Sequence, residues 1–390
     1  MAAIPVTPES NRAHANALLR AGRNDNAVAL LESWLRAATA DHAAWHLLSV
    51  AHTQCHRHAA ALKAIRRALA LAPQETQYQK QHGFTLVNLM RFDAAISVLL
   101  PLVRALPDAY AIMRGLHVAY YKAGKQPHAL ALGRRLLTFA DNTLMAIAKE
   151  SPAADIMPLS RGDARVISFA LVDADPKSAL GASANTLLAQ RHYPGWKCRF
   201  YVGQTVPPRV TAALQKNGAE IIDASRQYPH VPPALWANLV ADDPGVAVFL
   251  CRSSSARLSE KEAAAVAAWL HSGRRAHVMR DHILHRNLVL PGLWGARTDN
   301  PLFVEARIQR FMAAYGNPPS GREQRFLDSE IWPAIRGDSL IHDSYYPLFN
   351  AQPFPTMGKG DGQSHVGMGV AGTAALRREA ASLGLPWPQA

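Results

Sequence analysis

Charged and hydroxyl side chains follow several short apolar runs in the C-terminal part of this sequence. They include Asp173, the segment Arg252-Ser253-Ser254-Ser255-Ala256-Arg257, the segment Arg280-Asp281-His282 and, further on, the pair His342-Asp343. Arginine guanidinium groups form forked hydrogen bonds with phosphate, and a well-placed carboxylate can accept a proton as a general base. These residue types are therefore compatible with a site for an anionic ligand, provided that the fold brings them together.

The elements that would position these residues alternate between strand and helix. Short apolar runs that indicate buried strands occur at 166–171, 197–202, 219–222, 246–250 and 276–279. Helical patterns occur between them, at 178–190, 207–217, 232–241 and 259–272. This alternation predicts a mostly parallel sheet with helices on both faces. Ligands bind at the carboxyl ends of the strands in such sheets, which is where the charged residues fall.

The N-terminal part of the chain has a different pattern, a repeat of 34 residues. Alanine recurs at this spacing, at Ala27, Ala61, Ala95 and Ala129. Pro73 and Pro107 show the same spacing at the ends of two successive units. This period is typical of a tetratricopeptide-type helical array, whose units bury their apolar faces only by stacking. We expect such an array to bind another protein; an ordinary helical bundle is the alternative.

These patterns divide the chain into a helical part and an α/β part. We expect tetratricopeptide-type repeats over 1–148, a linker over 149–164, an α/β domain over 165–370 and a C-terminal helix or tail over 371–390. The linker is predicted because that segment mixes proline, serine, glycine and charge. The predicted fold class is multidomain, an all-α array followed by a Rossmann-like, mostly parallel α/β domain.

Composition narrows the function classes. The net charge is +13 and the apolar fraction is 49%. The absence of a basic run or a basic-aromatic block disfavours nucleic acid, whereas an anionic small ligand or an acidic protein partner is compatible with the charge. Cys55, Cys198 and Cys251 have no zinc or disulfide spacing. Because no apolar stretch of about 20 residues and no signal-like N-terminus occur, we expect a cytoplasmic protein without a membrane span.

An ordered set of short motifs extends over about residues 165–370. It comprises YPGW at 193–196, CRFY at 198–201, HVMRDH at 277–282, WGAR at 294–297, QRFL at 324–327, WP at 332–333 and HDS at 342–344. In these motifs the chain resembles bacterial nucleotide-sugar glycosyltransferases of the GT-A type. The resemblance implies a GT-A-like sheet, a nucleotide-sugar donor, and a divalent cation, Mn²⁺ or Mg²⁺, that a D-x-D motif holds against the leaving diphosphate.

The chain departs from the family pattern at the D-x-D motif itself. Its two acidic positions fall on Ser253 and Ser255, and a neutral hydroxyl cannot replace the charge of a carboxylate. Two further changes are Glu323, where the family has aspartate before glutamine, and Ala237, where an arginine often follows tryptophan. All three changes fall on one side of the expected pocket.

One interpretation is a metal-independent transferase. In it Arg252, Arg257, Arg280 or Lys359 takes the place of the metal on the diphosphate. The glycine-rich segment 357–362 would wrap the diphosphate with backbone N–H groups; a plain surface loop is the alternative for that segment.

Two other interpretations remain. In the first, a metal is held by His342, Asp343 and Glu323 without help from Ser253 and Ser255. The alternative is that His342 and Asp343 form a structural hydrogen-bonded pair. In the second, the domain keeps its fold without turnover, as a pseudo-enzyme. Cofactors are accordingly a nucleotide-sugar donor with Mn²⁺, Mg²⁺ or no metal.

The resemblance also assigns individual roles. Asp281 and Glu323 are the candidate catalytic residues, with Asp281 as general base toward the acceptor. Asp173, Ser253, Ser255 and Trp294 are candidate contacts to the nucleotide sugar, with Trp294 stacking on a sugar face. The alternatives are an ion pair between Arg280 and Asp281 and core packing of Trp294.

The sequence therefore favours a glycosyltransferase-like protein that transfers a sugar to a protein or glycan recruited by the repeats. The alternative is a catalytically inactive relative that acts as a protein-binding scaffold.

Overall fold

A computed structural model gives the structure of this protein. It describes residues 7–147, 162–316, 321–355, 365–370, 372–383 and 385. The chain divides into two compact units, Met1–Phe139 and Ala140–Ala390. Within the described residues, no helix has the length and apolar character needed to cross a membrane.

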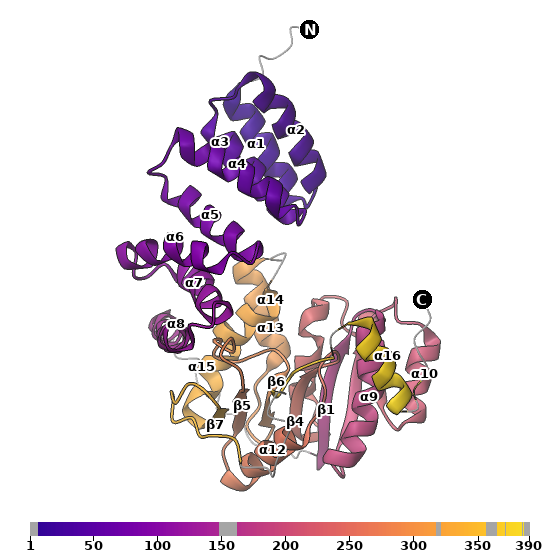
Figure 1. Ribbon diagram of the computed structural model, residues 1–390. Helices are drawn as coiled ribbons and strands as arrows, with labels where there is room; N and C mark the ends of the chain where they lie inside the picture. The colour runs from indigo at the N-terminus through magenta and orange to yellow at the C-terminus, as the bar shows by residue number, and fades with distance from the viewer. Residues whose placement is uncertain are drawn as a thin grey trace. The chain divides into compact units, whose positions relative to one another are not determined.

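The first unit is an array of helices in antiparallel pairs, so the predicted helical repeats are confirmed (Figure 1). The helices are α1 Pro8–Arg20, α2 Asn24–Ala37, α3 His42–Gln54, α4 His58–Leu71, α5 Thr76–Asn88, α6 Phe92–Ala105, α7 Tyr110–Lys122 and α8 Gln126–Ile147. Each repeat of 34 residues supplies one pair. The four recurring alanines have no exposed surface, and each lies in the second helix of its pair.

The turn inside each pair explains a second repeated position. Gly22 and Gly124 have φ angles of 70° and 72°, in the left-handed region that favours glycine. His56 and Met90 occupy the equivalent positions in the middle two units with φ angles of 57°. The repeat therefore imposes its turn geometry even where a side chain makes that geometry costly.

The second unit contains a mixed sheet of seven strands in the order β3-β2-β1-β4-β6-β5-β7. The strands are β1 Ala164–Leu171, β2 Lys197–Val202, β3 Glu220–Asp223, β4 Val246–Ser253, β5 Ala276–Arg280, β6 Leu293–Arg297 and β7 Ser339–Asp343. Only β6 runs antiparallel to its neighbours, β4 and β5. The predicted α/β class is confirmed, with β6 and β7 added to the five expected strands.

Helices cover the sheet as the alternation predicts (Figure 1). They are α9 Pro176–His192, α10 Pro208–Lys216, α11 Ala224–Gln227, α12 Glu260–Ser272, α13 Val304–Tyr315, α14 Arg322–Phe326, α15 Trp332–Ile335 and α16 Thr373–Ser382. The predicted helix at 232–241 is a 3-10 segment, Pro233–Asp242, and a π-helical turn, Leu327–Ile331, joins α14 to α15. In the core, the rings of Phe169 and Phe200 stack 4.7 Å apart between β1 and β2.

Candidate functional site

The serine turn, Ser253–Ser255, lies at the carboxyl end of β4, at the position where the sequence resemblance predicts a D-x-D motif. Ser253 is the last residue of the strand, and its Oγ lies 3.0 Å from Oγ of Ser255. The two hydroxyl groups therefore hydrogen-bond with each other. The turn presents a neutral pair with no carboxylate, so it offers a cation much weaker ligands than two aspartates would.

Backbone from two other segments packs directly against this turn. A Cβ atom on Gly181 of α9 would lie 2.0 Å from the carbonyl oxygen of Ser254, and one on Gly369 would lie 2.3 Å from that of Ser255. The cavity beside the turn has a volume of about 10 Å³. That volume is at the lower limit for one water molecule, so this cavity does not accommodate a nucleotide, whereas Ser253 itself is exposed at the surface.

Arg252, next to the turn, points into the core. Its Nε donates to Glu262 Oε1 at 2.5 Å, and its Nη1 donates to the carbonyl oxygens of Cys251 and Trp294 at 2.8 and 2.9 Å. The hydroxyl of Tyr193 also donates to Glu262 at 2.9 Å, and burial raises the pKa of this phenol well above its usual value. Arg252 is 4% exposed, so its charge is directed at Glu262 and away from any ligand.

Arg257 joins the turn to the C-terminal helix. Its Nε and Nη2 donate to the two carboxylate oxygens of Glu379 in α16, at 2.5 and 2.6 Å. Its backbone N–H donates to the carbonyl of Met368 at 3.1 Å. The two guanidinium N–H groups of Arg257 that could bind a diphosphate therefore already bind the carboxylate of Glu379.

Arg280 forms a fully buried ion pair at the end of β5. Its Nε donates to Asp343 Oδ2 at 2.6 Å, and both side chains have 0% exposure. Asp343 Oδ1 accepts from the backbone N–H groups of Tyr345 and Tyr346, each at 2.8 Å. Burial raises the pKa of Asp343, while the Arg280 guanidinium and these hydrogen bonds act in the opposite direction. The pair thus links the last residue of β5 to the last residue of β7.

The carboxylate of Asp281, the candidate general base, is enclosed by donors. Lys261 Nζ lies 2.7 and 2.6 Å from its two oxygens, Ser344 Oγ donates to Oδ1, and the backbone N–H of Val366 donates to Oδ2 at 2.8 Å. Asp281 is 4% exposed. Its partner is Lys261 and not the neighbouring Arg280, and in this arrangement an acceptor hydroxyl cannot reach it.

The two expected metal ligands point into separate contacts. His342 Nδ1 lies 2.8 Å from His277 Nε2, and burial lowers the pKa of His342 to about 4. Asp343 is held by Arg280, as described above. Within the described part of the chain, no group of three or more histidine, cysteine, aspartate or glutamate side chains is arranged to hold a metal ion.

Trp294 and Lys359 complete the expected donor contacts. Trp294 has 0% exposure, and its indole meets the ring of Phe249 edge-on with centroids 5.1 Å apart. It therefore packs in the core, with no face open to a sugar. Lys359 and the glycine-rich segment 357–362 lie outside the described residues. Asp173 is the one expected binding carboxylate that is exposed, directly after β1.

Glu323 of α14 has no ion-pair partner among the described residues, and no cation contributes to the shift of its pKa. Protein atoms surround its carboxyl group, although part of the residue remains exposed, and burial raises its pKa to about 7. A hydrogen bond with Asn238 acts in the opposite direction. A carboxyl group with a pKa near neutrality is suited to proton transfer.

The pKa of Glu323 predicts a stability change with pH. Because its folded pKa of about 7 exceeds the unfolded value of 4.5, its contribution is complete below pH 4.5 and is lost as the pH rises to about 7. We expect the wild type to lose on the order of 3 kcal/mol of unfolding free energy across this window relative to Glu323→Gln. Urea unfolding of both proteins at several pH values measures this difference. Parallel pH profiles would show that Glu323 titrates normally.

A cluster of three histidines beside Asp281 was not predicted from the sequence. The rings of His282, His285 and His365 have centroids 4.8 to 5.6 Å apart. Backbone N–H groups donate to Nδ1 of His282 and of His285, which places the proton of each neutral ring on Nε2 and leaves it without a lone pair for a metal. Burial and the neighbouring histidines lower the pKa of His285 to about 3. No spacing in the sequence connects His365 to the other two.

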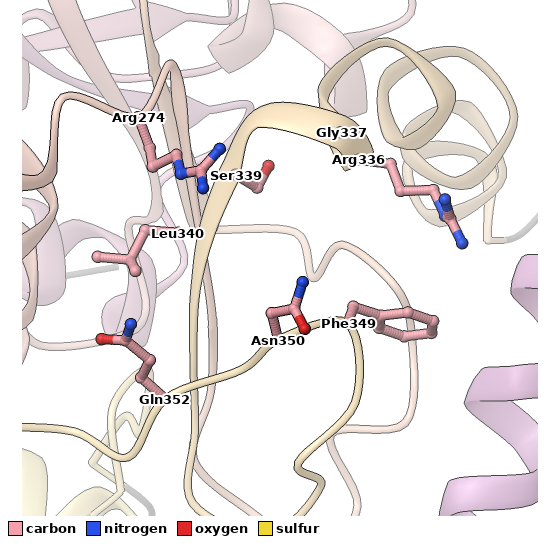
Figure 2. Close-up of a pocket in the computed structure, with 8 residues that line it drawn as sticks. All are labelled: Arg274, Arg336, Gly337, Ser339, Leu340, Phe349, Asn350 and Gln352. Atoms are coloured by element: carbon pink, nitrogen blue, oxygen red, sulfur yellow. The ribbon is translucent and has the colours of Figure 1, made fainter.

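A larger cavity, of about 120 Å³, lies at the opposite end of β7 (Figure 2). Figure 2 shows Arg274 and Arg336 among the side chains around it. Arg274 lies 3.3 Å from Asp338, and Arg336 makes two hydrogen bonds of 2.7 Å to Asp141. Each guanidinium group therefore already has a carboxylate partner, and the cavity shows no surplus of positive charge.

Comparisons with known proteins give only distant likenesses. No protein-family model and no curated protein matches the chain. A MamA protein of Desulfovibrio magneticus RS-1 is 18% identical over 35% of this chain and 77% of its own, with a TM-score of 0.33. A mutant of the Thermobaculum terrenum O-GlcNAc transferase is 21% identical over 63% of this chain, with a TM-score of 0.38. This chain covers 45% of that transferase chain.

Proposed function

We propose that this protein is a binding scaffold, in which the repeat array holds a partner protein and the glycosyltransferase-like α/β domain does not turn over a nucleotide sugar. The observation that carries this proposal is the pairing of the three strand-end arginines. Arg252, Arg257 and Arg280 bind Glu262, Glu379 and Asp343, respectively. A leaving diphosphate would have to displace these carboxylates, two of them deep in the core.

The serine turn supports the same proposal. A transferase of this kind needs positive charge on the leaving group, from a metal or from free cations. The serine turn has no carboxylate to hold a metal, and the neighbouring Arg252 and Arg257 are paired with Glu262 and Glu379. The repeat array, in contrast, has eight described helices, and successive helices from α1 to α7 contact one another. The array is thus the part of the chain that remains equipped to hold a partner protein.

One observation favours glycosyl transfer as a second candidate function. Glu323 has a pKa of about 7 and corresponds to an acidic residue of the glycosyltransferase motif. Asp173 is exposed at the end of β1, where a nucleotide would lie in sheets of this kind. In this candidate function the three arginine–carboxylate pairs stabilise the fold, and Glu323 transfers a proton during the reaction.

Release of nucleoside diphosphate from sugar donors separates the two functions. The full chain is incubated with uridine, guanosine and cytidine diphosphate sugars, with and without Mn²⁺, in parallel with Glu323→Gln. The scaffold proposal expects no release above the rate without protein in either variant. Release that Glu323→Gln abolishes, while circular dichroism shows the variant to be folded, would establish the transferase instead.

A further inference from the structure

The cavity of about 120 Å³ at the start of β7 takes no part in the function proposed above (Figure 2). Its walls come from Arg274 before β5, from the segment 336–340 at the start of β7, and from the returning segment 349–352. None of the residues that line it belongs to the motifs that carry the glycosyltransferase resemblance. The cavity is therefore a separate feature of the α/β domain, and its side chains call for a different role.

The wall formed by the segment 349–352 contains a strained turn. Phe349 and Asn350 have φ angles of 58° and 59°, in the left-handed region. Asparagine adopts this region more readily than most residues, whereas for a bulky side chain such as phenylalanine it is an uncommon conformation. No other two consecutive non-glycine residues of the described chain have positive φ angles. Backbone strain of this kind is concentrated at functional sites, which directs attention to the side chains that the turn positions.

Packing of the Phe349 ring fixes this turn. The ring meets that of Trp332 edge-on, with centroids 5.3 Å apart, and the guanidinium group of Arg336 lies 6.0 Å from its centroid. The amide of Asn350, next along the chain, lies among the side chains that line the cavity (Figure 2). The packed ring and the turn together hold an amide group at the cavity wall.

Gln352 supplies a second amide from the same segment. Its backbone N–H donates to the carbonyl of Ile341 at 2.8 Å, and its carbonyl accepts from the N–H of Asp343 at 2.9 Å, so its backbone is fixed against β7. Asn350 and Gln352 are exposed, and among the described residues their side-chain amides have no hydrogen-bond partner. Each amide offers one acceptor oxygen and two N–H donors. Two amides at one cavity wall are thus available to a ligand.

The arginines and the serine at the cavity add further donors and acceptors. Arg336 binds Asp141 through Nε and Nη2, which leaves its Nη1 without a partner in the described structure. Arg274 has a single contact of 3.3 Å to Asp338. The Oγ of Ser339 donates to a backbone carbonyl at 2.8 Å, so its lone pairs can still accept a hydrogen bond. Donors and acceptors therefore converge on the cavity, while the charges of both arginines are balanced.

This combination selects the chemistry of the ligand. An anion gains little, because each guanidinium group already faces a carboxylate, and an apolar molecule would displace water from the polar groups without replacing its hydrogen bonds. A hydroxyl group both donates and accepts, so a molecule with several hydroxyl groups can satisfy the amides, the guanidinium N–H groups and the serine oxygen together. At roughly 10–15 Å³ for one water molecule, the cavity holds about ten. That is room for one sugar ring.

We propose that this cavity is a binding site for a neutral polyhydroxyl molecule, either a single sugar ring or an open-chain polyol of similar size. The amides of Asn350 and Gln352 are its principal contacts, and Nη1 of Arg336 donates to a further hydroxyl group. The inference goes beyond the proposed function, because it gives the α/β domain a ligand of its own, away from the serine turn. A neutral ligand of about a dozen non-hydrogen atoms is expected to bind with a Kd on the order of several millimolar.

Ligand-observed NMR titration of the full chain tests this site. The ligands are glucose and galactose as neutral rings, sorbitol as an open-chain polyol, and glucuronate as an anionic counterpart of glucose. The test variant is Asn350→Gly with Gln352→Ala, in which glycine accepts the positive φ angle while the amide is removed. Gln352→Ala alone is a second test variant, at a position without positive φ. The control, Gln204→Ala with Gln227→Ala, removes two exposed amides elsewhere on the same domain.

A neutral ring or sorbitol is expected to bind saturably, and the double test variant to raise its Kd about tenfold or more while the control changes it less than about twofold. Binding of the rings alone would support the site with a sugar as ligand, and binding of sorbitol alone would support it with an open-chain polyol. No saturable binding up to about 100 mM, stronger binding of glucuronate, or equal losses in the test and control variants would overturn the proposal. The scaffold function is unaffected by these outcomes, because nucleotide release tests it separately.

Discussion

Replacing Arg280 by alanine is expected to lower the free energy of unfolding by about 3–5 kcal/mol, because it leaves Asp343 buried without its cation. Both side chains of the pair have 0% exposure. Two backbone N–H groups would still bond Asp343 but cannot balance its charge. Unfolding in urea, followed by circular dichroism, measures the loss.

The matched control for this change is Arg191→Ala, at an exposed position near the end of α9. We expect the control to stay within about 0.5 kcal/mol of the wild type. If Arg280→Ala were as stable as the control, Arg280 would not be part of the fold. Its place at the strand end would then have to be explained by a ligand.

Replacing Glu262 by glutamine is expected to cost about 3 kcal/mol of unfolding free energy. The change keeps the shape of the side chain but leaves the buried guanidinium of Arg252 without a counter-charge. Tyr193 also loses its charged acceptor. Because Arg252 Nη2 already lacks a hydrogen-bond partner in the core, the group has no second carboxylate to turn to among the described residues.

A paired replacement separates charge from packing at this position. Arg252→Met with Glu262→Leu removes both charges and keeps the volume, so it should be closer to the wild type than Glu262→Gln alone. The same urea measurement compares them. A Glu262→Gln protein as stable as the wild type would mean that Arg252 is balanced elsewhere, as it would be by a bound diphosphate.

The architecture was largely predictable from the sequence because its signals are local. Alanine at 34-residue spacing predicted the helical pairs, and alternating apolar runs predicted five of the seven strands. β6 and β7 were read as motif pieces because Leu293–Arg297 and Ser339–Asp343 are short and mixed in polarity. Their pairing with β4 and β5 is a contact between distant segments that no local pattern encodes.

The candidate site was predictable only in part, and the reason is side-chain direction. The sequence placed Arg252, Arg257 and Arg280 at strand ends, where the structure also has them. Their directions depend on partners far along the chain, such as Glu379, which is 122 residues from Arg257. Trp294 is similar: its motif suggested a sugar contact, but β6 lies inside the sheet and buries it. Glu323 is a candidate catalytic residue from the sequence, and in the structure burial raises its pKa to about 7.

Isothermal titration of the full chain with uridine, guanosine and cytidine diphosphate sugars, each with and without Mn²⁺, tests the central claim most directly. The pairing of all three arginines and the neutral serine turn predict no saturable heat of binding for any donor, in a sample that unfolds cooperatively. Saturable binding of one donor with a Kd below about 1 mM, which corresponds to roughly −4 kcal/mol, would contradict the account. It would mean that the strand ends still form a donor site.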